Sequence, residues 1–202
     1  MKYVWVLVIL IGVVLLIKAM YPKVSEVRNG VVISSYPTLT PTLEMKNGLA
    51  EPVAEFKKRI TKKFFGTYVT PQNSPVKPER FTGYHTGVDV EYGDVSGQVK
   101  VMAIDSGKVI MAGPVGGYGQ VVVIQHQRYL SLYGHVVPSV KVGQVVAKGE
   151  KIAILGKAYS SETGGERKHL HLGIINGLKI DYRGYVQNYN ELSGWINPMD
   201  LF

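Results

Sequence analysis

From about Phe64 to the C-terminus, apolar and polar residues alternate in short runs that glycines and other turn-forming residues separate. Alternation with a period of two residues is typical of strands that bury one face. Short strands with short connections predict an all-β domain, either an antiparallel β-sandwich or a partly open barrel. Asn176 and Gly177, after the last run, are typical of a tight two-residue hairpin turn. The expected strands are 98–104, 107–113, 119–126, 129–135, 151–155 and 169–175.

A different pattern stands near the N-terminus, where residues 3–17 form an unbroken apolar run. With residues 19–21 added and Lys18 snorkelling to the interface, the run approaches the roughly 20 residues of a transmembrane helix. Pro22 then ends the helix. A secretory signal peptide is the alternative, but no small-x-small cleavage site is evident. We therefore interpret residues 1–23 as a membrane anchor and keep a cleaved signal peptide as the alternative hypothesis.

Residues 24–63 connect this run to the alternating region and carry no recognisable motif. Prolines and threonines interrupt them around residue 40, and 49–60 is compatible with a short helix. We interpret the segment as a linker or tether that precedes a domain at 64–202.

Composition limits the chemistry that the chain can use. Its 202 residues are 46% hydrophobic and include 23 glycines, which fits one domain with a real core plus accessory segments. There is no cysteine, so a disulfide framework and a cysteine-type zinc finger are excluded. Any metal site must therefore consist of histidines and carboxylates.

The formal net charge of +8 is concentrated between Phe56 and Arg80, where seven basic residues face only Glu79. Such a stretch favours an anionic surface such as cell wall or lipid headgroups, and a solvated face without a dedicated partner is an equal alternative. No RNA-binding signature or basic helix with interleaved aromatics is present, so we expect no nucleic-acid partner.

Four of the five histidines fall in three places, and one of these places also holds a carboxylate. Three protein ligands and an open position make a catalytic zinc site, whereas four ligands close a structural one. We expect a metal on His85, Asp89 and one histidine of the pair His169 and His171. His135 and the other histidine of the pair are then free for proton transfer.

Strand geometry favours this division of labour within the pair. Residues two apart in a strand point to the same face, roughly 6.5 to 7 Å apart, so His169 and His171 face one way while Leu170 and Leu172 face the core. One histidine can bind the metal while the other reaches a bound water or the substrate. The fifth histidine, His126, closes an apolar strand, and we interpret it as structural. The acidic residues interpreted as turn or rim positions are Glu91, Asp94 and Asp105.

Three motifs in order resemble those of the lysostaphin-type, or LytM-like, zinc endopeptidases, which cut stem or cross-bridge peptides of bacterial peptidoglycan. They are Gly83–Asp89 (Gly-Tyr-His-Thr-Gly-Val-Asp), Leu132–His135 (Leu-Tyr-Gly-His) and His169–His171 (His-Leu-His). The resemblance extends from about Phe64 to Phe202 and includes the glycine-punctuated stretch 140–156.

This resemblance implies an enzyme that hydrolyses peptide bonds of peptidoglycan with a zinc-activated water. It implies one Zn²⁺ per domain on His85, Asp89 and His171, with His135 and His169 as the catalytic pair beside it. The roles of general base and oxyanion stabiliser within that pair stay open. No member of the five-residue set is missing, which argues against the metal-free members of the family that only activate other hydrolases. The lead-in at 160–168 is longer and more charged than expected, and we expect it to line the substrate groove.

Peptidoglycan as the partner implies a location in the bacterial cell envelope. The N-terminal helix would anchor the chain in the cytoplasmic membrane with the β domain outside, or the protein would be secreted if that segment is cleaved. The oligomeric state stays open. Two rival functions are a non-cleaving module that binds the wall or activates a hydrolase, and a lipoyl- or biotinyl-type carrier. The spacing at 140–149 resembles such carriers, but the usual lysine-centred attachment tripeptide is absent.

Overall fold

The structure is a computed structural model that describes residues 48–202. The expected transmembrane helix at 1–23 and the first part of the expected linker lie outside the described residues. Among the described residues, none forms a helix with the length and apolar character that crossing a bilayer requires.

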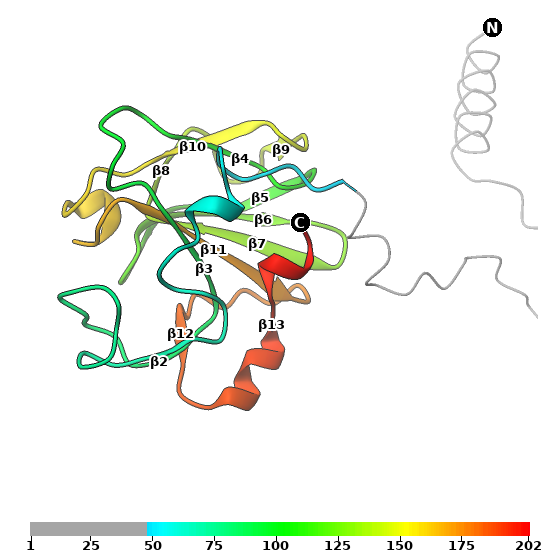
Figure 1. Cartoon of the computed structure of the whole chain (residues 1–202). Helices are drawn as coiled ribbons and strands as arrows, with labels where there is room; N and C mark the ends of the chain where they lie inside the picture. The colour runs from blue at the N-terminus through cyan, green and yellow to red at the C-terminus, as the bar shows by residue number, and fades with distance from the viewer. Residues whose placement is uncertain (1–47) are drawn as a thin grey trace, which may run out of the picture. The chain divides into compact units, whose positions relative to one another are not determined.

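Residues 48–202 form an all-β domain of antiparallel sheets with no closed barrel, as the alternation predicts (Figure 1). Its helical segments are short 3₁₀ turns, namely η1 (Lys57–Arg59), η2 (Ser161–Thr163), η3 (Tyr189–Gly194) and η4 (Pro198–Asp200). The strands are β1 (Tyr68–Val69), β2 (Gly83–His85), β3 (Gly87–Glu91), β4 (Lys100–Met102), β5 (Gly107–Val115), β6 (Gly119–Gln125), β7 (Tyr129–Gly134), β8 (Val136–Pro138), β9 (Val145–Val146), β10 (Lys151–Leu155), β11 (His169–Asn176), β12 (Tyr185–Val186) and β13 (Trp195–Ile196).

The strands form one large and two small sheets. The large sheet has the order β13-β11-β7-β6-β5-β9, and β3 pairs with β11 as well. One small sheet has the order β4-β10-β8, and the other has the order β1-β2-β12. Figure 1 shows β4, β8 and β10 on one side of the large sheet and β2 and β12 near its opposite end.

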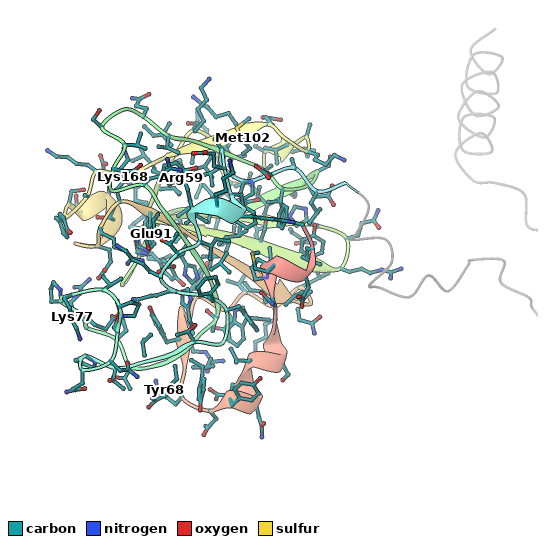
Figure 2. The ribbon with its side chains drawn as sticks, in the orientation of Figure 1. Arg59, Tyr68, Lys77, Glu91, Met102 and Lys168 are labelled. Atoms are coloured by element: carbon teal, nitrogen blue, oxygen red, sulfur yellow. The ribbon has the colours of Figure 1, made fainter. Side chains whose placement is uncertain are left out.

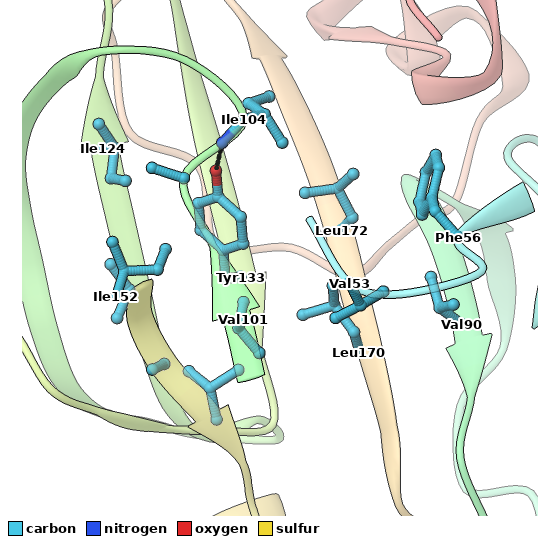
Figure 3. Close-up of a cluster of buried hydrophobic side chains, with 14 of the residues drawn as sticks. Val53, Phe56, Val90, Val101, Ile104, Ile124, Tyr133, Ile152, Leu170 and Leu172 are labelled. Carbon is cyan, nitrogen blue, oxygen red and sulfur yellow. Dashed lines mark hydrogen bonds between the residues drawn. The ribbon is translucent and has the colours of Figure 1, made fainter. Parts of the chain in front are cut away.

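The main core lies between the large sheet and the β4-β10-β8 sheet (Figure 3). Tyr133 of β7 is fully buried there, and its hydroxyl accepts a hydrogen bond of 2.9 Å from the backbone N–H of Ile104. Leu170 and Leu172 of β11 face this core with no exposed surface, as their strand parity predicts. His169 and His171 alternate with these leucines along the strand and therefore lie on the other face of β11.

The folded core begins before Phe64, where the sequence pattern places the domain boundary. Val53 and Phe56 (Figure 3) are buried with Ile60 in the same cluster as the strands. The Phe56 and Phe202 rings lie 4.7 Å apart. The segment also pairs with the β4 region, since Met102 N–H donates to Pro52 O at 2.8 Å. Residues 50–60 thus complete the core, although their lack of alternation made them look like linker. Their helical content is limited to η1.

The expected hairpin at Asn176 and Gly177 is not formed. After β11 the chain leaves the large sheet, pairs with β2 as β12, and only then returns as β13. At its C-terminal end β11 already has a neighbour on each edge, β7 on one side and β13 on the other. The edge of β11 that a direct hairpin partner would take is occupied by β13 instead.

Candidate metal centre

The first two candidate residues are brought together by the step from β2 to β3. Gly87 starts β3 between His85 and Asp89. A Cβ atom on Gly87 would lie 2.3 Å from the Leu172 carbonyl oxygen and 2.9 Å from the His171 ring. The glycine is therefore required by close packing against β11, which lets the His85 and Asp89 side chains approach the histidines of that strand.

The β3–β11 pairing then sets which side chains share a face. The two strands are antiparallel, with Asp89 opposite His171 and Glu91 opposite His169. Directly opposed residues have side chains on the same face of the sheet, with Cβ atoms about 4.5–5.5 Å apart. A carboxylate of β3 is thus aligned with each histidine of β11.

Three side-chain atoms converge to mutual distances that suit one metal ion. His85 Nε2 and His171 Nδ1 are 3.0 Å apart, and Asp89 Oδ1 lies 3.2 Å from each of them. At zinc bond lengths of about 2.0–2.1 Å, the corners of a coordination tetrahedron are about 3.3 Å apart. All three residues are buried. Two imidazole nitrogens and one carboxylate oxygen form a donor set that fits zinc and leaves a fourth position open.

Backbone carbonyl groups orient the rings around this point. His85 Nδ1 lies 3.2 Å from Phe64 O. Because a carbonyl oxygen only accepts, Nδ1 carries the hydrogen and Nε2 presents its lone pair to the centre. Burial raises the pKa of the Asp89 carboxyl, but the imidazole rings of His169, His85 and His171 that face it outweigh burial and hold the pKa well below its usual value. The group is therefore ionised, as a metal ligand must be.

His135 and His169 lie beside the three ligand atoms, with ring centroids 4.3 Å apart. His135 Nδ1 donates to Tyr118 O at 2.9 Å and Thr163 O at 3.0 Å. His169 Nδ1 donates to Arg167 O at 2.9 Å, and its Nε2 lies 3.5 Å from Asp89 Oδ2. In both rings the Nε2 lone pair is therefore available for proton transfer.

The backbone at His135 adopts a left-handed conformation, with φ of 62° directly after β7. A residue with a Cβ atom adopts this region only at an energetic cost, and such strain gathers at functional sites. The chain continues from this residue as β8, and the His135 ring lies within hydrogen-bond distance of the Tyr118 and Thr163 carbonyl oxygens.

Burial keeps these histidines in the neutral form. It lowers the pKa of His135 to about 4, and it lowers the pKa of His169 well below the ordinary value of 6.5. The pKa of His171 is lowered too, again chiefly by burial. At neutral pH His171 thus offers a lone pair to a metal, while His135 and His169 can accept a proton.

Asp89 and His171 line one cleft of about 570 Å³, together with His135 and His169. Tyr118 and Tyr185 stand on its walls. The Tyr118 ring lies 5.3 Å from the His135 ring and 5.2 Å from the His171 ring, centroid to centroid. Burial raises the pKa of both tyrosines, so both hydroxyls stay protonated and can donate to a bound substrate. The cleft is large enough for a segment of peptide.

A buried ion pair supports one wall of this cleft. Lys63 Nζ lies 2.5 Å from Glu79 Oε2 and donates to the Tyr185 hydroxyl at 2.9 Å. Ser74 also donates to Glu79 Oε2, at 2.8 Å. Burial raises the pKa of Glu79, but the hydrogen bonds from Lys63, the Phe81 N–H and Ser74 outweigh it, so the pKa is lowered from 4.5. The pair therefore contributes fully to stability above pH 4.5, and this contribution is lost as the pH falls through the lowered pKa.

Replacing Lys63 with methionine is expected to destabilise the fold by about 3–5 kcal/mol at pH 7, because Glu79 is left buried without its partner. The free energy of unfolding in urea measures the loss. Lys58→Met is the control, since the Lys58–Glu55 pair is exposed and is worth about 0–1 kcal/mol. Adding Glu79→Gln to the Lys63 variant should recover part of the loss. If Lys63→Met and Lys58→Met had the same free energy of unfolding, the buried ion pair would not be stabilising the fold.

The structure brings together all five candidate site residues and leaves His126 apart. His126 is buried behind the large sheet, where its ring nitrogens contact Ser106 O at 2.9 Å and Ser131 Oγ at 2.8 Å. The sequence pattern does not indicate that Tyr118, Tyr185 and Lys63 line the cleft. Glu91, expected at a turn or rim, instead belongs to β3 and contacts buried Arg167. Its position two residues after Asp89 places both side chains on one face of a strand, and this spacing could have indicated its role.

Comparison with known proteins relates this geometry to a known family. Residues 83–182, which include every residue of the centre, match Peptidase family M23. Over these residues the chain is similar to peptidase family M23. A stretch of 119 residues is 40% identical to an uncharacterized metalloprotease of Haemophilus influenzae, and it covers 54% of this chain and 24% of that protein. A second protein of that organism, uncharacterized, is 37% identical over 117 residues, or 51% of this chain and 27% of its own. The chain thus spans about a quarter of the curated relatives it matches.

Solved structures share the fold of the M23 domain. The catalytic domain of the antimicrobial peptidase lysostaphin from Staphylococcus simulans aligns with a TM-score of 0.50 and 23% identity, over 70% of this chain and 91% of that one. A chain of the SpoIIQ–SpoIIIAH pore-forming complex aligns with a TM-score of 0.52 and 23% identity, over 78% of this chain and 92% of that one. The resemblance to lysostaphin-type peptidases that the three motifs indicate is confirmed at the level of family and fold.

Proposed function

We propose that the chain is a zinc metalloendopeptidase that hydrolyses peptide bonds of bacterial peptidoglycan, in stem or cross-bridge peptides. The observation that carries the proposal is the convergence of His85 Nε2, Asp89 Oδ1 and His171 Nδ1 to within 3.0–3.2 Å, next to two neutral histidines in a cleft. The match to peptidase family M23 supports both the metal and the reaction.

The residues divide the chemistry between them. When bound, zinc supplies Lewis acidity that lowers the pKa of a coordinated water and polarises the scissile carbonyl. His135 or His169 accepts a proton through Nε2 and returns it to the leaving amine, and the other donates to the developing oxyanion. The backbone carbonyls at their Nδ1 atoms hold both rings in the required tautomer. The hydroxyls of Tyr118 and Tyr185 provide further donors toward the substrate.

Peptidoglycan as substrate is supported by the family match and by the motifs at 83–89, 132–135 and 169–171. The same proposal sets the location, because peptidoglycan lies outside the cytoplasmic membrane. We propose that the domain works in the cell envelope, with the apolar segment at 1–23 as its anchor. The excess of basic residues, +8 overall, favours contact with an anionic wall.

Digestion of purified peptidoglycan by the fragment 24–202 tests the proposal directly. Mass spectrometry of the released fragments should show new amino termini, which vanish with a chelator and return with added zinc. The position of those termini identifies the bond that is cleaved. A protein that binds one zinc per chain but cleaves no wall preparation would overturn the enzyme proposal and favour a wall-binding or hydrolase-activating module.

A further inference from the structure

Arg167 places its guanidinium between two carboxylates of β3. Its side chain is only 9% exposed. Nη2 donates to Asp89 Oδ2 at 2.9 Å and to Glu91 Oε1 at 2.5 Å, and Nε lies 3.1 and 3.0 Å from the two oxygens of Glu91. In Figure 2 the labels of Glu91 and Lys168 mark this region, on the side of the molecule that carries η2. Charge-assisted contacts of this kind are the strong hydrogen bonds of proteins.

The strand register explains why these three groups meet. β3 and β11 pair Glu91 with His169, and the pairing continues to Lys168, whose carbonyl oxygen accepts from the Tyr92 N–H at 3.0 Å. Arg167 lies in the loop before β11, two residues before His169. From there its guanidinium reaches the Asp89 and Glu91 carboxylates, on the face that carries the two histidines.

The two oxygens of Asp89 have different partners. Oδ1 lies 3.2 Å from His85 Nε2 and 3.2 Å from His171 Nδ1, at the candidate metal position. Oδ2 points to Arg167. A carboxylate whose second oxygen is held by a guanidinium has one oxygen left for a metal, and it cannot rotate freely to offer both.

Arg167 is itself held by the carboxylates. No atom of the described residues accepts a hydrogen bond from its Nη1. Its orientation therefore depends on Glu91, which binds Nε and Nη2 together, and on Asp89. Glu91 also supplies the charge that offsets a buried cation, and Lys62 Nζ lies 3.6 Å from its Oε2 at the more exposed end.

We propose that Arg167, held by Glu91, is a positioning residue that fixes Asp89 as a one-oxygen ligand and thereby sets the metal affinity and coordination number of the centre. The proposal rests on the zinc site of the proposed function. Groups that orient a metal ligand from outside the coordination sphere contribute about 10–100-fold to metal affinity. The charged lead-in before the histidine pair, expected to line the groove, thus has a second role at the metal.

The test is a titration of the metal-free fragment 24–202 with Zn²⁺ in competition with a coloured chelator, and a visible spectrum of the Co²⁺-loaded protein. Arg167→Met is expected to weaken zinc binding about 10–100-fold. Its cobalt absorption should also weaken, because Asp89 can then bind with both oxygens and four-coordinate Co²⁺ absorbs more strongly than five-coordinate Co²⁺. Neither readout depends on turnover.

Arg167→Lys covers the case in which the methionine variant does not fold. Lysine retains the positive charge between the carboxylates, but a single ammonium cannot replace a fork that binds Asp89 and Glu91 at once. We expect it to shift zinc affinity and the cobalt spectrum in the same direction. Arg59→Met is the matched control, because Arg59 is an ion-paired arginine that contacts the Asp94 carboxylate at 2.8 Å. It touches Glu91 only at the backbone carbonyl oxygen, at 3.1 Å, and neither the Glu91 nor the Asp89 carboxylate. The control variant should leave both readouts unchanged.

The outcomes separate this proposal from the one on which it rests. If the unsubstituted fragment binds no zinc, both proposals fail. If it binds one zinc, but a folded Arg167 variant has the same zinc affinity and the same cobalt spectrum, then Arg167 only ties β3 to the loop before β11, and the positioning role is wrong while the zinc site stands.

Discussion

A chain with His171→Ala is expected to bind no zinc and to show no peptidase activity, whereas His169→Ala should keep one zinc and lose turnover. His171 Nδ1 is one of the three converging ligand atoms, at 3.2 Å from Asp89 Oδ1. His169 instead donates through Nδ1 to a backbone carbonyl and leaves Nε2 for proton transfer. Removing one general acid–base group reduces turnover about 10²–10⁴-fold. Metal content by mass spectrometry and cleavage rates separate the two variants.

His126→Gln serves as the control for both variants. This fifth histidine is equally buried, but its contacts are with Ser106 and Ser131 behind the sheet. It should retain zinc and activity even if its stability falls. If His171→Ala still bound one zinc per chain, the assignment of His171 as a ligand would be wrong. If His169→Ala lost its zinc, His169 would be the ligand and His171 the residue for proton transfer.

Phe56→Ala is expected to destabilise the domain by about 3–5 kcal/mol, the usual cost of removing a buried aromatic ring. Phe56 has no exposed surface and packs against Phe202, so its loss leaves a cavity between the N-terminal segment of the core and the C-terminus. A fragment that begins at residue 62 lacks Val53 and Ile60 as well. We expect that fragment to be less stable than any single variant of this segment.

Urea unfolding at pH 7 measures both effects. Phe64→Ala is the comparison, because the Phe64 side chain is 47% exposed and surface substitutions change stability by about 0.5 kcal/mol or less. If a fragment beginning at 62 unfolds at the same urea concentration as one beginning at 48, then residues 48–61 are a tether, as the sequence pattern indicates, and not part of the core.

The long strands of this domain could be read from the sequence because each contains a full period of alternation. The expected strand at 169–175 matches β11, and its apolar residues Leu170 and Leu172 are buried as predicted. Strands of two or three residues, such as β1, β12 and β13, contain too few positions to show a period. Phe56 and its neighbours form no regular element other than η1, so only tertiary packing reveals that they are core.

The candidate site, like the fold, could be predicted from the sequence only in part. Motif spacing singled out the five residues that meet, since histidines are few and the family resemblance orders them. Their geometry depends on contacts between distant parts of the chain, such as β3 with β11, and on one left-handed residue at His135. Arg167 and Glu91 belong to no motif. Their contacts depend on the register of β3 against β11 and on the path of the loop before β11, which a single sequence does not specify.

The structure of β11 limits how the sequence of this domain can vary. One face of this strand carries His169 and His171 and the other fills the core, so a single inserted residue would exchange histidines for leucines and disable chemistry and folding together. The loops at 157–166 and 177–184 flank the same cleft without being strands. Changes of length or charge there alter the substrate that fits while the strand stays fixed. We expect relatives with different specificities to differ in these loops and to keep β11 at constant length.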